Sequence, residues 1–322
     1  MYEKKKIAII FIFIFIYLKY LLKNNKALKS INIAYSLNNN YIYPVMVSIT
    51  SILINSKNNT FIQFHLLITN NFKLIHIRKF LSLKKVKSNC KFRFYKIEKH
   101  FKGWIHGRNK TISAFFRIFL GEIIYSTDKI IYLDGDTLIY NDLTEMYELN
   151  MDNLYFRGIY EIFPRFRGKN HTSICDGVML INIKLIREEK LYKKFKKYYF
   201  YYYNKGIYYG DQFILNNFFY HKIGYLPAKY GIFFINKEKM QLYRTVRPII
   251  YSQTEILDAI NNPVIRHLWG YRNTDCFRVK PWKIKKKSKI KEEWNYYARK
   301  TGYYYFICKT YIYACKNLMK EQ

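Results

Sequence analysis

The hydrophobic pattern of the first hundred residues alternates between short apolar runs and longer stretches with helical spacing. Runs at 31–37, 61–69 and 91–97 predict strands, and apolar residues at helical intervals predict helices at 45–56 and 73–83. Alternation of strand and helix is typical of a mostly parallel sheet with crossover helices. The pattern therefore predicts an α/β fold.

The same alternation continues through the middle of the chain. Three stretches have helical spacing, at 111–124, 185–203 and 209–220. Four apolar runs predict further strands, at 129–133, 177–183, 222–234 and 263–269. The first two of these runs are apolar almost throughout, as expected of central strands that are covered on both faces. No internal repeat and no clear second domain interrupt the pattern.

The N-terminal end has a different pattern. An unbroken apolar run covers residues 7–18, whereas a helix that crosses a bilayer needs about twenty residues. Lysines flank the run on both sides, and no small-residue cleavage site follows it. We expect a membrane-associated segment, either a short anchor or an interfacial helix. A buried N-terminal helix or strand is the alternative.

The charge of the chain is strongly positive. Among 322 residues, 56 are Lys or Arg and 22 are Asp or Glu, which gives a formal net charge of +34. Such a charge attracts polyanions or anionic membranes, and a solvated basic surface without a partner is the alternative. No zinc finger, RNA-recognition signature or basic zipper accompanies the charge, so nucleic acid is not the expected partner. The five cysteines include no C-x-x-C pair, which disfavours a disulfide framework or zinc site and favours a reducing compartment.

Two carboxylates follow the buried run at 129–133. Asp134 and Asp136, separated by Gly135, lie where the predicted strand ends, and ligands of open α/β sheets bind beyond such ends. Residues i and i+2 of an extended backbone point to the same side, so both carboxylates could hold one divalent cation that in turn binds a diphosphate. A surface turn is the alternative, because Asp-Gly is a common turn dipeptide.

The segment "FFRIFLGEIIYSTDKIIYLDGDTLIYNDLTEMYELN" resembles the central segment of glycosyltransferase family 8. Further segments resemble the family in the same order, namely "NIAYSLNNNYIYPVMVSITSI", "ICDGVMLINIKLIREEKL", "YGDQFILN", "LPAKYG" and "IRHLWG…KPW". The resemblance implies a retaining, nucleotide-sugar-dependent enzyme with a GT-A fold, a Rossmann-like, mostly parallel mixed sheet flanked by helices. It divides the chain into an N-terminal segment and linker (1–30), a GT-A domain (31–282) and a basic aromatic, helical C-terminal tail (283–322).

The resemblance assigns a metal site to Asp134, Asp136 and His267, with Asp134 also near the donor ribose. An imidazole ligand suits Mn²⁺ better than Mg²⁺, although Mg²⁺ is possible. A packed, structural histidine is the alternative for His267. Gly270 would let the backbone approach the donor phosphates, and Lys280 would contact the diphosphate.

Arg272 is a rival of Lys280 for the diphosphate contact, because the spacing after Gly270 is longer than in the lipopolysaccharide galactosyltransferases. Asn38, Asn40 and Tyr41 match the loop that holds uracil and ribose, although an Asn-rich turn is the alternative. Many members of the family have Asp near Asn38.

The resemblance places four further residues beside the donor sugar. Asp211 and Gln212 would lie near the anomeric carbon and the acceptor, Gly177 would allow close approach of the sugar, and Asp176 would contact its hydroxyls. Asp211 and Gln212 could instead cap a helix. Retention requires a double displacement or a front-side attack, and the sequence does not choose between them.

Arg117 resembles the donor-contacting arginine of the family. A structural ion pair with a nearby carboxylate is the alternative for this residue.

Basic residues alternate with aromatic ones after residue 282. This composition suits the headgroup layer of an anionic membrane, and a helix that packs on the body of the protein is the alternative. An acceptor on a lipid would be presented at such a surface.

The sequence therefore predicts Mn²⁺-dependent transfer of a hexose, glucose or galactose, from a UDP-hexose donor to a saccharide or glycolipid acceptor. The product would be lipopolysaccharide or another cell-surface glycan, made at the cytoplasmic face of the bacterial inner membrane. A non-catalytic membrane- or polyanion-binding protein on the same scaffold and a eukaryotic Golgi glycosyltransferase are the alternatives.

Overall fold

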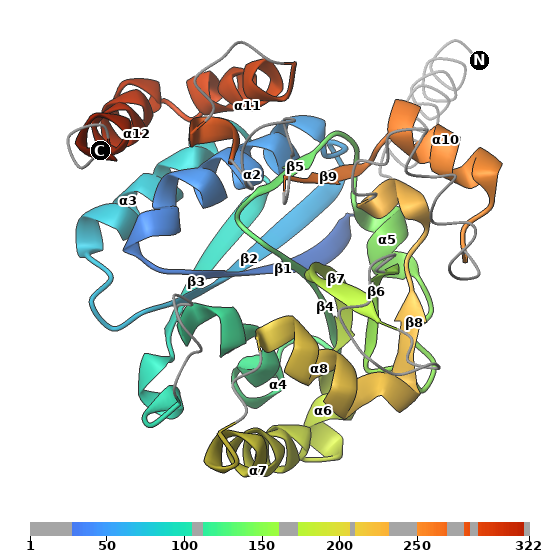
Figure 1. The fold of residues 1–322 in the computed structure, drawn as a ribbon. Coiled ribbons are helices and arrows are strands. Elements are labelled where there is room, and N and C mark those ends of the chain that lie inside the picture. Colours follow the sequence, from blue (N-terminus) through green and yellow to red (C-terminus); the bar gives the residue numbers. More distant parts are fainter. Residues whose placement is uncertain are drawn as a thin grey trace, which may run out of the picture.

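The computed structural model describes residues 28–104, 112–160, 173–206, 210–231, 250–268, 280–283 and 289–318. The strands in these residues are β1 (Lys29–Leu37), β2 (Thr60–Ile68), β3 (Cys90–Lys96), β4 (Lys129–Leu133), β5 (Thr137–Ile139), β6 (Phe156–Tyr160), β7 (Ile174–Asn182), β8 (Ile223–Tyr225) and β9 (Ile265–His267). Seven of them form one sheet in the order β3-β2-β1-β4-β7-β6-β8, and β5 pairs with β9 in a second, two-stranded sheet (Figure 1).

The main sheet is mixed but mostly parallel. β1 runs parallel to both β2 and β4, β2 to β3, and β6 to β8, whereas β7 runs antiparallel to both β4 and β6. This arrangement confirms the predicted Rossmann-like fold class.

Helices cover both faces of the main sheet (Figure 1). On one face lie α2 (Ile42–Asn55), α3 (Leu74–Ser82), α11 (Lys289–Lys300) and α12 (Tyr304–Leu318), and on the other lie α4 (Leu120–Ile123), α6 (Ile183–Glu188), α7 (Leu191–Asn204) and α8 (Asp211–Phe219). The remaining α-helices in the described residues are α5 (Thr144–Glu148) and α10 (Gln253–Asn261). Short 3₁₀ helices lie at Asn39–Tyr41, Leu83–Lys85, Glu98–Phe101, Ile112–Phe119, Tyr220–Lys222, Ala228–Tyr230 and Pro281–Lys283.

β4 shows why the central strands are apolar on both sides. Ile131 and Leu133 belong to the core that contains α2 and α3, whereas Ile130 and Tyr132 belong to the core that contains α7 and α8. All four side chains are almost completely buried. Burial of one such aliphatic side chain is worth about 1.5–3 kcal/mol, so the strand that carries Asp134 at its end is held rigidly in the centre of the molecule.

Three of the predicted elements differ from the structure. The helix expected at 111–124 is a 3₁₀ helix over Ile112–Phe119 followed by α4, because its side chains are buried almost all round and tertiary packing overrides α-helical spacing. The helix expected at 185–203 is split into α6 and α7 by Lys190, which has a positive φ of 52° without a glycine or proline to mark the break. Of the strand expected at 222–234, the described residues up to 231 form a strand at Ile223–Tyr225, and a 3₁₀ turn follows Pro227.

The C-terminal helices pack on the body of the protein. Ile290, Trp294 and Tyr297 of α11 are buried in a cluster with Val47 of α2 and Leu138 of β5. The predicted helical character of the tail is confirmed, and the packing alternative is correct for α11.

No helix in the described part of the chain has both the length and the apolar character that a bilayer crossing requires. The apolar run at 7–18 lies outside the described residues, so the expectation of a membrane-associated N-terminal segment stays a prediction.

Candidate functional site

Asp134 and Asp136 occupy the connection between β4 and β5, at the carboxyl end of the central strand. The backbone N–H of Asp134 donates to the carbonyl of Gly177 on β7 (2.8 Å), and the N–H of Leu268 donates to the carbonyl of Asp136 (2.7 Å). β5 pairs with β9 so that Thr137 lies opposite His267. The short antiparallel pair therefore brings His267 to the two carboxylates from a segment 131 positions beyond Asp136 in the sequence.

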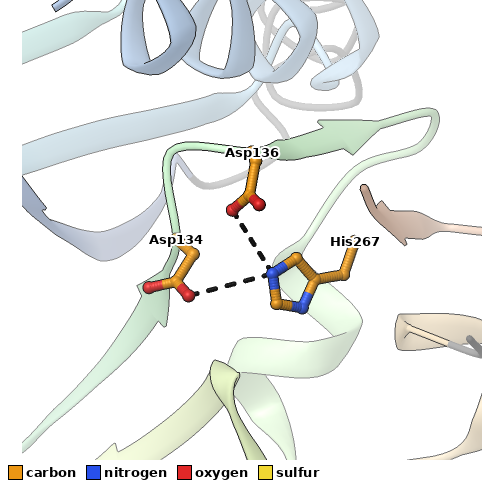
Figure 2. A group of neighbouring side chains, drawn as sticks. All are labelled: Asp134, Asp136 and His267. Atoms are coloured by element: carbon orange, nitrogen blue, oxygen red, sulfur yellow. Dashed lines mark ion pairs between the residues drawn. The ribbon is translucent and has the colours of Figure 1, made fainter. Parts of the chain in front are cut away.

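The side chains of Asp134, Asp136 and His267 converge on one point (Figure 2). His267 Nε2 lies 3.3 Å from Asp136 Oδ1 and 3.8 Å from Asp134 Oδ2. One ligand atom from each residue lies within 4.8 Å of the other two. Asp136 and His267 are buried, while the Asp134 side chain is 29% exposed and forms the open side of the cluster. The donor set, two carboxylates and one imidazole, is suited to a divalent cation.

Gly177 leaves room for this cluster. A Cβ at this position would lie 2.2 Å from His267 Cε1 and 2.8 Å from Asp134 Oδ2, closer than any side chain tolerates. Only glycine therefore lets β7 pass beside the two ligands. Gly135, between the two aspartates, also has no room for a side chain, because a Cβ there would lie 2.6 Å from a methyl group of Val45.

Cys175 contacts the ring nitrogen of His267 that faces away from the carboxylates. Its Sγ lies 3.6 Å from His267 Nδ1. Burial raises the pKa of the Cys175 thiol, against the opposing effect of His267, so the thiol is protonated at neutral pH. Burial lowers the pKa of His267, but Cys175 and the carboxylates of Asp134 and Asp176 outweigh burial and raise the pKa above its ordinary value.

Arg117 is a buried cation among three carboxylates. Its Nη2 lies 3.2 Å from Asp134 Oδ1 and 3.5 Å from Asp211 Oδ2, and its Nη1 lies 3.1 Å from Asp176 Oδ2. The guanidinium also lies 4.5 Å from the ring centroid of Tyr132. Burial lowers the pKa of Arg117, but Asp176, Tyr132, Asp134 and Asp211 outweigh burial and raise the pKa well above its usual value. The ion pairs expected in the structural alternative for Arg117 are present, and the guanidinium joins β7 and α8 to the end of β4. The contact of Arg117 with the donor stays a prediction.

Lys280 and Gln212 also lie near this cluster. The ammonium of Lys280 contacts the carboxylate of Asp136. Gln212 follows Asp211 in the first turn of α8 and is half-buried. Gly270 and Arg272 lie outside the described residues.

The loop after β1 forms the other end of the site. The side chain of Asn38 accepts a hydrogen bond from the N–H of Asn40 (2.9 Å), so it caps the 3₁₀ turn that starts α2. The ring of Tyr41 lies against Gly135, where a Cβ would be 3.2 Å from Tyr41 Cδ1. Burial, and to a lesser extent the charge of Asp134, raise the pKa of Tyr41. The loop is thus directly beside the carboxylate cluster.

Aromatic side chains of the C-terminal part extend this end of the site. Trp282 makes an edge contact with Tyr41, with ring centroids 6.3 Å apart, and a tilted contact with Tyr311 of α12 at 5.8 Å. The hydroxyl of Tyr311 donates to the carbonyl of Asn40 (3.4 Å). The sequence predicts Tyr41 at the site but assigns no role to Trp282, Tyr311 or Cys175, because nothing in the local pattern distinguishes these three from core or surface residues.

One family model matches most of this chain, and curated and solved glycosyltransferases resemble it. The family model described as "Glycosyl transferase family 8" matches residues 32–285. The lipopolysaccharide 1,2-glucosyltransferase of Escherichia coli is 26% identical over 277 residues, which cover 79% of this chain and 80% of the relative. The galactosyltransferase LgtC, solved with donor and acceptor sugar analogues, has a TM-score of 0.65 and 22% identity over 84% of this chain and 96% of its own.

A larger solved protein shares the same fold. The bifunctional glycosyltransferase WbbM, solved in its apo form, has a TM-score of 0.69 and 17% identity. The alignment covers 89% of this chain but only 52% of WbbM. At these identities, the likeness to WbbM and LgtC establishes a shared fold.

Proposed function

Because the chain belongs to glycosyltransferase family 8, we propose that it transfers a hexose from a UDP-sugar to a saccharide acceptor with retention of anomeric configuration. One observation carries the proposal: Asp134, Asp136 and His267 bring their ligand atoms within 4.8 Å of one another at the carboxyl end of the central strand. Glucose and galactose are the proposed sugars, since a glucosyltransferase and a galactosyltransferase are among the similar proteins.

Mn²⁺ is the proposed cation, held by Asp134, Asp136 and His267. A nitrogen ligand favours Mn²⁺ over Mg²⁺, although Mg²⁺ is the second candidate. The residues fit such an ion, because Gly177 keeps the space between His267 and Asp134 open where even a Cβ would touch both. When bound, a divalent cation supplies positive charge for the diphosphate leaving group.

The chain's own cations and its first loop would bind the nucleotide. The ammonium of Lys280, beside Asp136, is placed to meet a diphosphate at this edge and to stabilise its developing charge. We assign Asn38, Asn40 and Tyr41 to uracil and ribose, because their loop lies directly beside Gly135. Asp134 is assigned to the ribose as well.

Gly270 is assigned to the same diphosphate, where its backbone would approach the phosphate oxygens closely.

The sugar would lie on the side of Asp134 that faces Arg117. This guanidinium holds the carboxylates of Asp176 and Asp211 next to Asp134. We assign Asp211 and Gln212 to the anomeric carbon and the acceptor, and Asp176 to the sugar hydroxyls. A double displacement and a front-side attack are both compatible with this assignment, because the carboxylate of Asp211 lies in the same group as those of Asp134 and Asp176.

Gly177 completes this side of the proposed donor site. Because Gly177 has no side chain, β7 can lie close to the sugar as well as to His267 and Asp134.

The proposed acceptor is lipopolysaccharide or another cell-surface glycan, a class to which the substrate named for the Escherichia coli relative belongs. The proposed place of action is the cytoplasmic face of a bacterial inner membrane. A net charge of +34 and the basic aromatic tail support association with an anionic membrane. The N-terminal segment 1–30 is proposed as a further membrane contact.

Released UDP is the direct test of the proposed function. Purified protein with Mn²⁺ should release UDP from UDP-glucose or UDP-galactose faster than from UDP-N-acetylglucosamine, and EDTA should remove most of this activity. A glycolipid acceptor should accelerate the release. Saturable, Mn²⁺-dependent UDP binding without UDP release from any donor would instead favour a non-catalytic binding protein.

Cys175→Ala should weaken Mn²⁺ binding about tenfold, because outer partners of a histidine ligand commonly change metal affinity by about 10–100-fold. Cys175 Sγ lies 3.6 Å from His267 Nδ1. A cation on Nε2 requires the ring proton on Nδ1, and the Cys175 sulfur would accept it and so keep the Nε2 lone pair facing the carboxylates. Titration of Mn²⁺ by electron paramagnetic resonance measures the affinity.

Two comparisons separate this role of Cys175 from a structural one. Cys175→Ser should restore most of the affinity, because its hydroxyl can accept the same hydrogen bond. Cys90→Ala, in a buried cysteine of β3, should leave the affinity unchanged. Equal Mn²⁺ affinity in Cys175→Ala and the parent would contradict the assignment.

A further inference from the structure

A cavity lies apart from the carboxylate cluster and shares no lining residue with it. It has a volume of about 610 Å³ and lies between α2, α3 and the turn that joins α11 to α12. Lys85 and Lys300 line it together with the hydroxyl-bearing Ser82 and Tyr303 and the apolar Ile54. Both lysines are exposed, and no acidic side chain is among the described residues that line the cavity. The lining therefore suits an anion with an apolar part attached.

The surroundings of this cavity are positively charged over a wide area. No Asp or Glu occurs in residues 70–97, which include α3, or in residues 294–320, which include most of α11 and all of α12. The first stretch is rich in Lys and Arg, and the second carries Arg299, Lys300, Lys309, Lys316 and Lys320 without an opposing acidic residue. In addition, α12 begins at Tyr304, directly after the lining residues Thr301, Gly302 and Tyr303. The positive end of the α12 dipole therefore adds to the attraction for an anion.

The N-terminal end of α12 packs beside α3 (Figure 1). Ser82 Oγ lies 3.2 Å from the hydroxyl of Tyr303. The ammonium of Lys79 lies 5.6 Å from the ring centroid of Tyr303 and 5.5 Å from that of Phe306. These contacts hold the N-terminal end of α12 against α3.

Large apolar side chains are exposed on both of these helices. On α3 the exposed fractions are 62% for Leu74, 52% for Ile75 and 41% for Leu81. On α12 they are 71% for Tyr305 and 50% for Phe306. Several large exposed apolar groups on two helices that contact each other indicate a binding surface rather than ordinary solvent exposure. Apolar side chains surrounded by lysines are typical of a helix face that enters the headgroup layer of an anionic bilayer.

We propose that α3 and the first turns of α12 dock on an anionic membrane, and that the cavity binds the phosphate of one phospholipid headgroup between Lys85 and Lys300. The exposed apolar side chains of this docking surface then lie at the boundary with the acyl chains. This inference rests on the proposed function, because an acceptor glycolipid is reached from such a surface. It differs from the sequence-based expectation in assigning the contact to α3 and a specific cavity as well as to the tail.

The docking surface is joined to the proposed nucleotide site through α12. Tyr311 of this helix donates to the carbonyl of Asn40, and its ring contacts Trp282, which in turn contacts Tyr41. A docked α12 therefore holds the donor end of the site at a fixed orientation to the membrane surface.

Binding of the full chain to vesicles tests the proposal. The readout is the ratio of affinities for phosphatidylglycerol-containing vesicles and pure phosphatidylcholine vesicles, because an apolar N-terminal contact contributes to both. Lys85→Gln/Lys300→Gln should lower this ratio by about tenfold or more, since each lysine near an anionic surface is worth several-fold in affinity. The matched control is Lys193→Gln/Lys197→Gln on α7, which removes the same charge from the opposite face of the sheet (Figure 1).

The control and two further measurements decide the outcome. An equal fall of the ratio in both double variants would show that net charge alone carries the binding and would overturn the proposal. A second result would also overturn the proposal. If glycerol phosphate raises the melting temperature of the parent but the protein does not prefer anionic vesicles, the ligand of the cavity is a soluble phosphate ester. UDP release in solution should stay unchanged in both double variants. This measurement distinguishes a wrong docking proposal from a wrong enzymatic assignment.

Discussion

Asp136→Asn should lower Mn²⁺-dependent UDP release by about 10²–10³-fold, the usual cost of removing one preorganised electrostatic group from an active site. The Asp136 carboxylate is buried and lies 3.3 Å from His267 Nε2. Asparagine keeps the shape of this side chain but removes its charge and one ligand oxygen. It also leaves Lys280 without the carboxylate that it contacts. Initial rates of UDP release as a function of Mn²⁺ concentration measure the effect.

Asp142→Asn is the matched control for this experiment. Asp142 is also buried, but its carboxylate accepts hydrogen bonds from the N–H groups of Lys57 and Thr144, both at 2.8 Å. Burial raises the pKa of Asp142, but the hydrogen bonds from Thr144, Lys57 and Thr60 outweigh burial and lower the pKa. This variant should lower the melting temperature and leave the Mn²⁺ dependence unchanged. If Asp136→Asn behaves in the same way, the metal assignment is wrong.

The carboxylate cluster could be predicted from the sequence only in part. The apolar run at 129–133 and the acidic pair after it follow from local pattern, because a central strand is buried on both faces and ends at the ligand-binding edge. His267 does not follow from local pattern. It lies on β9, and both β9 and its partner β5 have only three residues, too few for a periodicity to show. The family resemblance supplied that residue, and the β5–β9 pairing explains its position.

Arg117 illustrates a different limit. The sequence indicated a cation near the site but could not say how many carboxylates it contacts, since Asp176 and Asp211 come from β7 and α8. Their meeting depends on how these elements pack across β4.

α3 shows how far a hydrophobic pattern can mislead about burial. Its spacing predicts a helix at 73–83, and the structure has one at Leu74–Ser82. The same spacing suggests that its apolar residues face the core, yet Leu74, Ile75 and Leu81 are exposed and only Phe80 is buried. The local pattern identifies the helix. It does not identify α12, which packs beside α3, because α12 lies more than two hundred residues further along the chain. Surfaces made from distant segments therefore emerge only from the structure.

Arg117→Met should lower the free energy of unfolding at pH 7.5 by about 3–5 kcal/mol, the cost of leaving buried charges without their partner. Arg117 is 5% exposed and lies within ion-pair distance of Asp134, Asp176 and Asp211. Methionine fills a similar volume but provides no positive charge for these carboxylates. Urea-induced unfolding followed by circular dichroism measures the loss.

The pH dependence of this loss tests its electrostatic origin. In the parent, the pKa of Arg117 is raised well above its usual value, so its stabilising contribution is fully present below that usual value and constant between pH 5 and 8. In Arg117→Met, acidification protonates carboxylates that lack a counterion and removes their repulsion. The difference in stability between parent and variant should therefore shrink as the pH falls from about 7.5 to about 5.

An exposed ion pair provides the comparison for Arg117→Met. Lys222 pairs with Glu189 at 2.8 Å, and the two side chains are 30% and 31% exposed. Lys222→Met should change stability far less at any pH, because solvent can replace the lost partner. The loss of unfolding free energy in Arg117→Met could instead be as small as in Lys222→Met, or it could fail to shrink with acidification. Either result would mean that packing rather than charge holds Arg117. The three carboxylates would then need another source of compensation, and the ammonium of Lys280, which contacts Asp136, is one candidate for it.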